Sequence, residues 1–184
     1  MRLLFEVSFE VCNKVGGIYT VVSSKVPSVQ KHVDRYIAIG PWFRDRAAHD
    51  FIQYGPEEVP DDIQRVFNEM SKKGIDCTYG RWNITGQPET ILLDVSRFAS
   101  VENRNYLKRR YWEYFQVDSI NARWDFDEPM CFSTAAGMLV EEFLNINEDD
   151  DIDAVLQTHE WMTGFAALYV KAREMEQVII PVRT

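Results

Sequence analysis

The chain has 184 residues, of which 46% are hydrophobic, 13% aromatic and 27% charged, a composition that supports one packed domain and excludes disordered, collagen-like and low-complexity proteins. Its 20 Lys and Arg against 29 Asp and Glu give a net charge of −9, so it lacks the broad basic surface that nucleic-acid binding requires and is disfavoured at anionic membranes. Its apolar stretches are all shorter than the roughly 20 residues of a membrane helix, so we expect no nucleic-acid and no membrane partner.

The first half of the chain alternates apolar runs of strand type with runs of helical spacing. The predicted elements are a strand at residues 3–7, a helix over 18–29, a strand at 36–39 and a helix over 61–73. The glycine-bearing stretch at 13–17 predicts a turn between the first two, and Gly40-Pro41 predicts the end of the second strand. Whether Pro27 breaks the first helix is left open by the pattern.

The second half continues the alternation. The predicted elements are strands at 76–82 and 90–95, helices over 103–115 and 130–144, a strand at 154–156, a helix over 164–175 and a strand at 178–180. Strands that alternate with helices predict a mostly parallel, Rossmann-like α/β sheet with helices on both faces. The acidic run at 148–151 lacks the spacing and glycine of a calcium loop and is interpreted as a solvated connection.

The last strand suggests that the chain is incomplete. A buried strand at 178–182 with no helix after it would leave one face of the sheet uncovered. We therefore expect residues 1–184 to be a truncated part of a larger domain.

A first candidate site is the turn Lys14-Val15-Gly16-Gly17. Ligands of open parallel sheets bind beyond the carboxyl ends of the strands. Gly16 and Gly17 let backbone approach a ligand, the next helix offers free N–H groups, and Lys14 adds positive charge, which together suit a phosphate. The pattern matches neither established phosphate-loop motif, and a tight turn without a ligand explains it equally well.

A second candidate follows the predicted strand at 154–156, where His159, Glu160 and Trp161 stand in succession. An imidazole there can hydrogen-bond a substrate hydroxyl, and an indole can stack on a sugar. The alternatives are a structural histidine, a Glu160 that caps the next helix, and a Trp161 that packs. The other two histidines, His32 and His49, are interpreted as surface residues.

Two charged clusters lie near the predicted helix at 130–144. Asp127 and Glu128 precede it and either complement its positive end or bind sugar hydroxyls. The basic run Lys108-Arg109-Arg110 is interpreted as a solvated helix face, at most one that touches a glucan or a partner subunit.

The cysteines indicate a reducing compartment. Cys12, Cys77 and Cys131 are widely spaced and form no C-x-x-C pair, which argues against a disulfide framework and a zinc site. The apolar N-terminus carries Glu6 and Glu10 and no small-residue cleavage site, so it is a poor signal peptide. We expect a cytoplasmic protein without a metal site or cofactor.

The sequence also resembles a known family. The segments Phe5-Glu6-Val7, Glu10-Val11 and the run NKVGGIYTV from Asn13 to Val21 resemble the opening of glycogen synthases of the animal and fungal branch and their bacterial relatives. Further similar segments follow in the expected order: Arg35-Tyr36, Gly40-Pro41, Lys72-Lys73-Gly74, Gly80-Arg81-Trp82, residues 88–94 and His159-Glu160-Trp161 with Gly164. The resemblance covers nearly the whole chain.

This resemblance implies the GT-B architecture, in which two Rossmann-like domains face each other across a cleft. Residues 1–184 would be the amino-terminal domain, truncated, without the carboxy-terminal domain that holds most of the donor and the catalytic glutamate. It assigns Lys14 and the turn Gly16-Gly17 to the donor phosphates and His159 to the donor glucose. Sugar or acceptor contacts are expected at Glu160, Trp161, Asp127 and Glu128.

The implied activity is a retaining transfer of glucose from UDP-glucose or ADP-glucose to the 4-hydroxyl of an α-1,4-glucan, without a metal or cofactor and with homo-oligomers formed through the full-length chain. This fragment alone is expected to be inactive. Two alternatives stay open: another GT-B glycosyltransferase or glucan phosphorylase, and a non-catalytic glucan-binding or scaffold module.

Overall fold

The computed structural model describes residues 1–148, 151–178 and 180–184. Within this part of the chain, one seven-stranded sheet has the order β3-β4-β5-β2-β1-β6-β7. The strands are β1 (Arg2–Val7), β2 (Arg35–Pro41), β3 (Phe51–Gln53), β4 (Asp76–Trp82), β5 (Glu89–Asp94), β6 (Asp153–Thr158) and β7 (Val182–Arg183). β5, β2, β1, β6 and β7 are parallel neighbours, whereas β4 runs antiparallel to both β3 and β5. The predicted mostly parallel, Rossmann-like sheet is confirmed.

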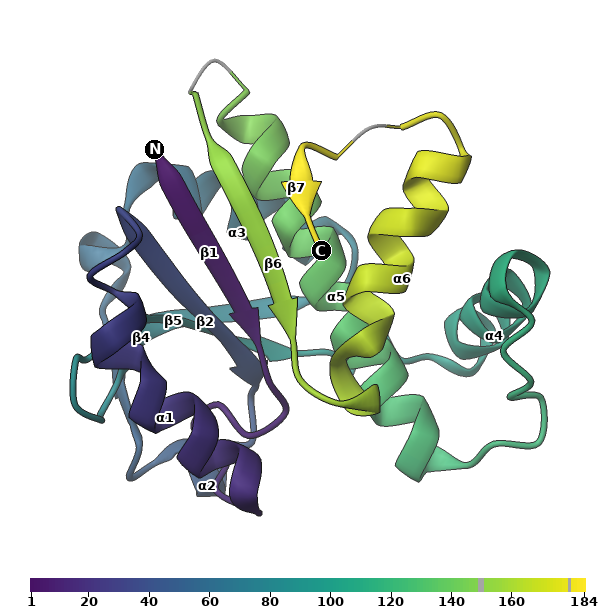
Figure 1. Cartoon of the computed structure of the whole chain (residues 1–184). Coiled ribbons are helices and arrows are strands. Elements are labelled where there is room, and N and C mark those ends of the chain that lie inside the picture. Colours follow the sequence, from purple (N-terminus) through teal and green to yellow (C-terminus); the bar gives the residue numbers. More distant parts are fainter. Residues whose placement is uncertain (149–150, 179) are drawn as a thin grey trace.

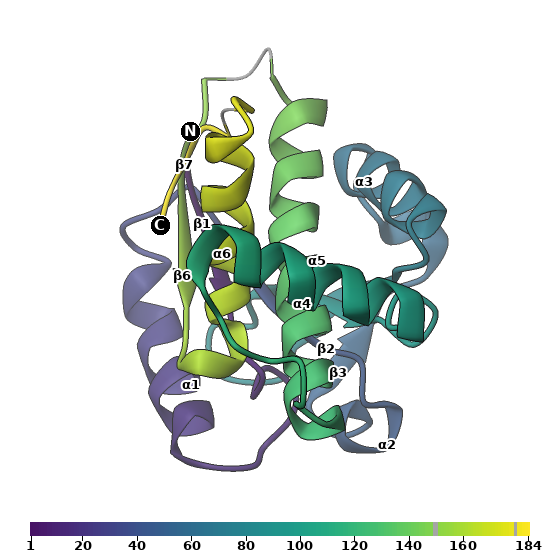
Figure 2. The same ribbon diagram turned by 90° about the vertical axis from the view of Figure 1, so that its right-hand side faces the viewer.

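Helices cover both faces of the sheet, as predicted. They are α1 (Gly17–Val29), α2 (Arg44–Ala47), the 3-10 helix η1 (Pro56–Glu58), α3 (Asp61–Lys72), α4 (Val101–Phe115), α5 (Trp124–Ile146) and α6 (Trp161–Met175). α1 lies on one face, α3, α5 and α6 lie on the other, and α4 crosses outside that second layer (Figures 1 and 2). Among the described residues, no helix combines the length and the apolar character needed to cross a membrane.

Alternation along the central strands divides the core between the two faces. In β1, Leu3 and Phe5 belong to the larger core under α3, α5 and α6, whereas Leu4 belongs to the smaller core under α1. The smaller core is completed by Val22 and Val26, which α1 turns toward the sheet. Pro27 lies within α1, so the helix is not broken there.

The antiparallel edge of the sheet contains elements that the sequence pattern missed. β4 and β5 are joined by a short turn, and a connection that short can join only antiparallel strands. β3 and α2 are too short for any periodic pattern to reveal. β3 packs so closely on β4 that a Cβ on Gly80 would lie 2.0 Å from the carbonyl oxygen of Ile52, so this edge requires glycine.

Several predicted boundaries were wrong, among them the start of α6, which is Trp161 and not residue 164. β2 continues through Gly40 to Pro41, because Gly40 leaves room for Val11, which passes 2.7 Å from the place where a Cβ would stand. α5 begins at Trp124 and not at residue 130, since tertiary contacts of its first turns hold a helix on both sides of Pro129.

Another wrong boundary concerns the last strand. Val178 lies outside any strand, and β7 is a short edge strand with an exposed Arg183 rather than a buried strand. Ile179 of the predicted strand lies outside the described residues, as do Asp149 and Asp150 of the predicted acidic connection.

Candidate functional site

The candidate site lies at the edge of the sheet where the parallel strands β1, β2 and β6 end. The arrowheads of β1 and β6 point to this edge, and α1 and α6 begin beside it (Figure 1). The loop after β1 carries Lys14, Gly16 and Gly17, and the turn after β6 carries His159 and Glu160. Because the N-terminus of a helix carries partial positive charge and N–H groups that have no partner within the helix, this edge suits an anionic ligand.

The central feature of this edge is a buried carboxylate on β1, that of Glu6, which is 0% exposed. Its Oε1 lies 2.6 Å from Nε2 of His159 and 2.6 Å from Nζ of Lys25. Its Oε2 accepts a hydrogen bond from the hydroxyl of Tyr36. One carboxylate thus connects β1, β2, α1 and the turn after β6, and we call these four residues the Glu6 cluster.

The partners of Glu6 decide its charge. Burial alone would raise the pKa of Glu6, but hydrogen bonds from His159, Lys25 and Tyr36 and the charge of Lys25 hold it below its ordinary value of 4.5. Burial and the adjacent carboxylate raise the pKa of Tyr36. At neutral pH the cluster therefore contains an ionised carboxylate and a protonated phenol.

The turn that carries His159 is shaped by Thr163 and Glu160. The backbone N–H of His159 donates to Oγ1 of Thr163 at 2.7 Å, and that hydroxyl donates to the carbonyl of His159 at 2.6 Å. Glu160 adopts φ 61° and ψ −176°, a conformation that is found almost only at glycine. Such local strain is typical of binding and catalytic turns.

The glycine turn is exposed, but a carboxylate of the protein itself already binds its N–H groups. Lys14, Gly16 and Gly17 all face solvent. The buried carboxylate of Glu10 accepts from the N–H of Gly16 at 2.8 Å and from the N–H of Tyr19 at 2.9 Å, so it caps α1. A Cβ on Gly16 would lie 3.1 Å from this carboxylate, whereas one on Gly17 would meet nothing within 4 Å. The space available to a ligand is thus at Gly17.

Trp161 and Glu128 lie near this edge. Trp161 is 54% exposed and stacks on Phe126 with ring centroids 6.0 Å apart, so one face of the indole is covered. Burial raises the pKa of Glu128, against the opposing effects of Arg46 and a hydrogen bond with Trp124. Arg46 also donates to Asn13, next to Lys14, at 3.1 Å.

Asp127 forms ion pairs with α4. Its carboxylate is buried and lies 3.1 Å from a guanidinium nitrogen of Arg104 and 2.7 Å from Nζ of Lys108. These pairs join α4 to α5. These contacts give Asp127 a role that neither interpretation of the sequence included, the stabilisation of the helix pair.

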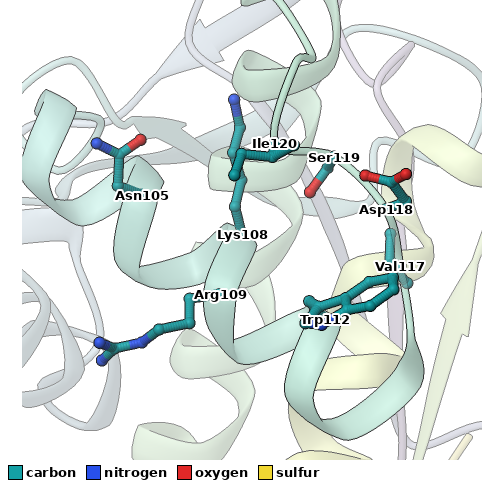
Figure 3. A pocket seen from close by; sticks show the side chains of 8 residues that line it. All are labelled: Asn105, Lys108, Arg109, Trp112, Val117, Asp118, Ser119 and Ile120. Atoms are coloured by element: carbon teal, nitrogen blue, oxygen red, sulfur yellow. The ribbon is translucent and has the colours of Figure 1, made fainter.

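A separate cavity of about 560 Å³ lies between α4 and the loop that follows it. Its lining includes Trp112 and Lys108 of α4 and Ile120 of the loop (Figure 3). The lining residues come from this helix and loop alone, so the cavity shares none with the sheet edge.

Sequence reasoning missed Glu6, Lys25, Tyr36 and Glu10 as parts of the site. The available signal was the position of Glu6 inside an apolar strand, because a buried carboxylate needs a cationic or hydrogen-bonding partner. Lys25 and Tyr36 had no comparable signal, since each has an ordinary place on a helix or strand.

The described residues contain no group of three or more His, Cys, Asp or Glu side chains arranged to hold a metal ion. Cys12 and Cys131 are buried and Cys77 is half-buried. Burial raises the pKa of Cys131 to about 12 and raises those of Cys12 and Cys77 as well. All three are protonated thiols at neutral pH.

Comparison with known proteins identifies the family. The family model described as glycogen synthase matches residues 6–183. The liver glycogen (starch) synthase of Rattus norvegicus is 32% identical over 175 residues, which are 94% of this chain and 24% of that protein. The glycogen (starch) synthase of Neurospora crassa is 30% identical over 180 residues, and isoform 2 of Saccharomyces cerevisiae is 29% identical over 186.

The chain therefore spans about a quarter of the length of the curated relatives it matches. The match to the family model extends over almost the entire chain, from Glu6 of the buried cluster to Arg183. The chain belongs to the glycogen synthase family.

Proposed function

We propose that this chain is the amino-terminal part of a glycogen synthase, which transfers glucose from a nucleotide-glucose donor to the 4-hydroxyl of an α-1,4-glucan with retention at the anomeric carbon. The observation that carries the proposal is the placement of His159 and the Lys14 turn at one edge of the sheet in a chain of this family. The names of the relatives support a glycogen (starch) synthase activity.

In this proposal, residues 1–184 supply one Rossmann-like half of a GT-B enzyme. The second half, with the catalytic glutamate and most contacts to the nucleotide, belongs to a further domain. The coverage of only 24% of the rat relative supports this division. The proposal also includes a cytoplasmic location and homo-oligomers of the full-length protein.

The donor diphosphate would bind at the N-terminus of α1. Departure of the diphosphate develops negative charge, and preorganised cationic and N–H groups stabilise that charge most effectively in a site closed to water. Lys14 is exposed and available for this role, and Gly17 leaves open space for a phosphate oxygen. Because Glu10 already accepts from Gly16 and Tyr19, the diphosphate must approach on the Gly17 side or displace this carboxylate.

His159 would hold the donor glucose. Nε2 of its ring is engaged by Glu6, which leaves Nδ1 for a sugar hydroxyl. A hydrogen bond there would orient the sugar for transfer and exclude unproductive poses. Glu160, the open face of Trp161 and Glu128 are the sugar or acceptor contacts in this scheme, which requires neither a metal nor a cofactor.

The test is a transfer assay with the protein made from its complete reading frame. Glycogen is the acceptor, and UDP-glucose and ADP-glucose are compared as donors, which also settles the preferred nucleotide. We expect transfer from one of them, and we expect His159→Ala to lower kcat/KM at least about tenfold, the scale of a lost transition-state contact.

The matched control is His32→Ala, since His32 is exposed at the opposite edge of the sheet, between α1 and β2. It should leave transfer unchanged. Absence of transfer from both donors, with retained binding of glycogen, would favour the non-catalytic glucan-binding module. Release of glucose 1-phosphate from glycogen and phosphate would favour a phosphorylase.

A further inference from the structure

The Glu6 cluster brings together side chains that are far apart in the sequence. Glu6 and His159 are 153 positions apart in sequence, yet their side chains meet at 2.6 Å. Glu6 pairs in the sheet with Gln157 of the neighbouring strand. The carboxylate therefore stands on one central strand and reaches the histidine directly after the next.

Hydrogen-bond chemistry fixes which nitrogen of His159 carries the proton. The pKa of Glu6 lies below its ordinary value, so Glu6 is ionised at neutral pH and can only accept. Nε2 of His159 must then be the donor in the contact with Oε1. In neutral imidazole the other nitrogen, Nδ1, carries the lone pair.

The other partners keep Glu6 in this role. Oε2 accepts from Tyr36, and Oε1 is also approached by Lys25, so both oxygens are engaged. Lys25 reaches further to the side-chain carbonyl of Gln157 at 2.9 Å, two residues before His159. The titratable groups that face Glu6 are therefore His159 from the turn after β6, Lys25 from α1 and Tyr36 from β2.

We propose that Glu6 is a positioning residue that holds the His159 ring in the tautomer with hydrogen on Nε2, so that Nδ1 is presented to the ligand as an acceptor. The assignment of that ligand as the donor sugar rests on the proposed function. A hydroxyl of the sugar would donate to Nδ1. Because Glu6 stands on a strand hydrogen-bonded on both sides, the ring is held more rigidly than a loop contact could hold it.

The first experiment observes the tautomer directly in the complete protein labelled with isotopic histidine. The nitrogen and carbon shifts of an imidazole ring distinguish the two neutral tautomers, and His159→Gln assigns the signal. We expect the Nε2–H form in the unmodified protein at neutral pH. Predominance of the Nδ1–H form would overturn the proposal without any variant.

Variants then distinguish a role of Glu6 in orienting the His159 ring from a role in packing alone. Glu6→Gln removes the charge and allows the amide to present either a donor or an acceptor, so we expect a mixture of tautomers. The triple variant Glu6→Leu, Lys25→Met, Tyr36→Phe replaces the buried network by apolar side chains of similar size, an exchange that proteins often tolerate. It removes the acceptor completely, so the tautomer preference should disappear.

Tyr36→Phe alone is the matched control. It removes one hydrogen bond to Glu6 but leaves the contact with His159. We expect the tautomer of the unmodified protein to persist in it. Either result contrary to these expectations, loss of the preference in Tyr36→Phe or its persistence in the triple variant, would overturn the proposal.

Kinetics test the consequence for transfer. Glu6→Gln should lower kcat at least about tenfold while KM for the donor changes less, because a misplaced ring loses transition-state contact before ground-state binding. Unchanged kcat in Glu6→Gln, in a protein where His159→Ala reduces it, would overturn the positioning role.

The two proposals fail separately. A protein that holds His159 in the Nε2–H form through Glu6 but transfers no glucose contradicts the proposed function and supports the positioning of the ring. A protein that transfers glucose with an unconstrained His159 supports the function and contradicts the positioning.

Discussion

Among the buried carboxylates that pair with cations, Asp127 and Glu6 differ in what else they contact. Asp127 pairs with the cationic side chains of Arg104 and Lys108, within a pair of helices. Glu6 contacts a lysine, a tyrosine and a histidine at the edge where the parallel strands end. A buried ion pair is therefore not by itself the mark of a site. The distinguishing features of Glu6 are a histidine partner, whose second ring nitrogen can meet a ligand, and a position at the ligand-binding edge.

The largest effect is expected from Asp127→Ala. It leaves Arg104 and Lys108 without the partner that joins α4 to α5, and removal of one member of a buried pair costs about 3 kcal/mol. Chemical denaturation followed by circular dichroism measures this loss. Asp125→Ala, an exposed neighbour in the same helix, is the control and should cost less than about 1 kcal/mol. Equal losses in the two variants would show that the pair adds no stability.

Glu160→Gly should stabilise the protein by about 1 kcal/mol, because glycine accepts the φ of 61° without strain. Glu174→Gly, within α6, has no such strain to relieve and should destabilise it. Thermal melts of both variants provide the comparison. If Glu160 contacts the sugar as proposed, Glu160→Gly should transfer glucose more slowly although it is more stable. An increase in both transfer and stability would show that Glu160 is not part of the site.

Glu10→Ala removes the carboxylate that caps α1. Loss of an N-terminal cap costs about 1 kcal/mol, which denaturation measures. The same change frees the N–H groups of Gly16 and Tyr19, so inorganic phosphate should raise the melting temperature of the variant more than that of the unmodified protein. An equal response to phosphate would argue against competition between Glu10 and an anion.

The smallest effect is a pH dependence of the Glu6 cluster. The pKa of Glu6 is lowered from 4.5, so its interactions stabilise the folded protein above that pH and are lost as the pH falls through the lowered value. The stability difference between the unmodified protein and the triple apolar variant should be constant near neutrality and should shift toward the variant in acid. A difference that stays constant down to the lowest measurable pH would contradict this assignment.

Much of this architecture follows from local sequence pattern. The apolar runs of β1, β2, β5 and β6 and the helical spacing of α1, α3 and α6 predict the sheet and its two covered faces. What the pattern could not predict depends on tertiary contacts. The start of α5 at Trp124 depends on Asp127 and Phe126 meeting α4 and α6, and β3 exists only as the pairing partner of β4.

The site shows the same division. His159 and the Lys14 turn are visible in the sequence because each follows a predicted strand. The residues that contact His159 and its surroundings could not be predicted in this way. Glu6, Lys25 and Tyr36 come together only when β1, β2 and β6 are adjacent and α1 lies on their face. The charge of Glu6 within an apolar strand was the single local hint.

The position of β1 between β2 and β6 also has a consequence during synthesis on the ribosome. β2 is synthesised soon after β1, but the partner of the other edge of β1 is missing until Asp153 to Thr158 emerge, which at ordinary translation rates takes on the order of ten seconds. An exposed apolar strand edge invites aggregation during that interval, and an internal charge opposes it. We therefore expect the charge of Glu6 to oppose aggregation of this strand before the site is built on it.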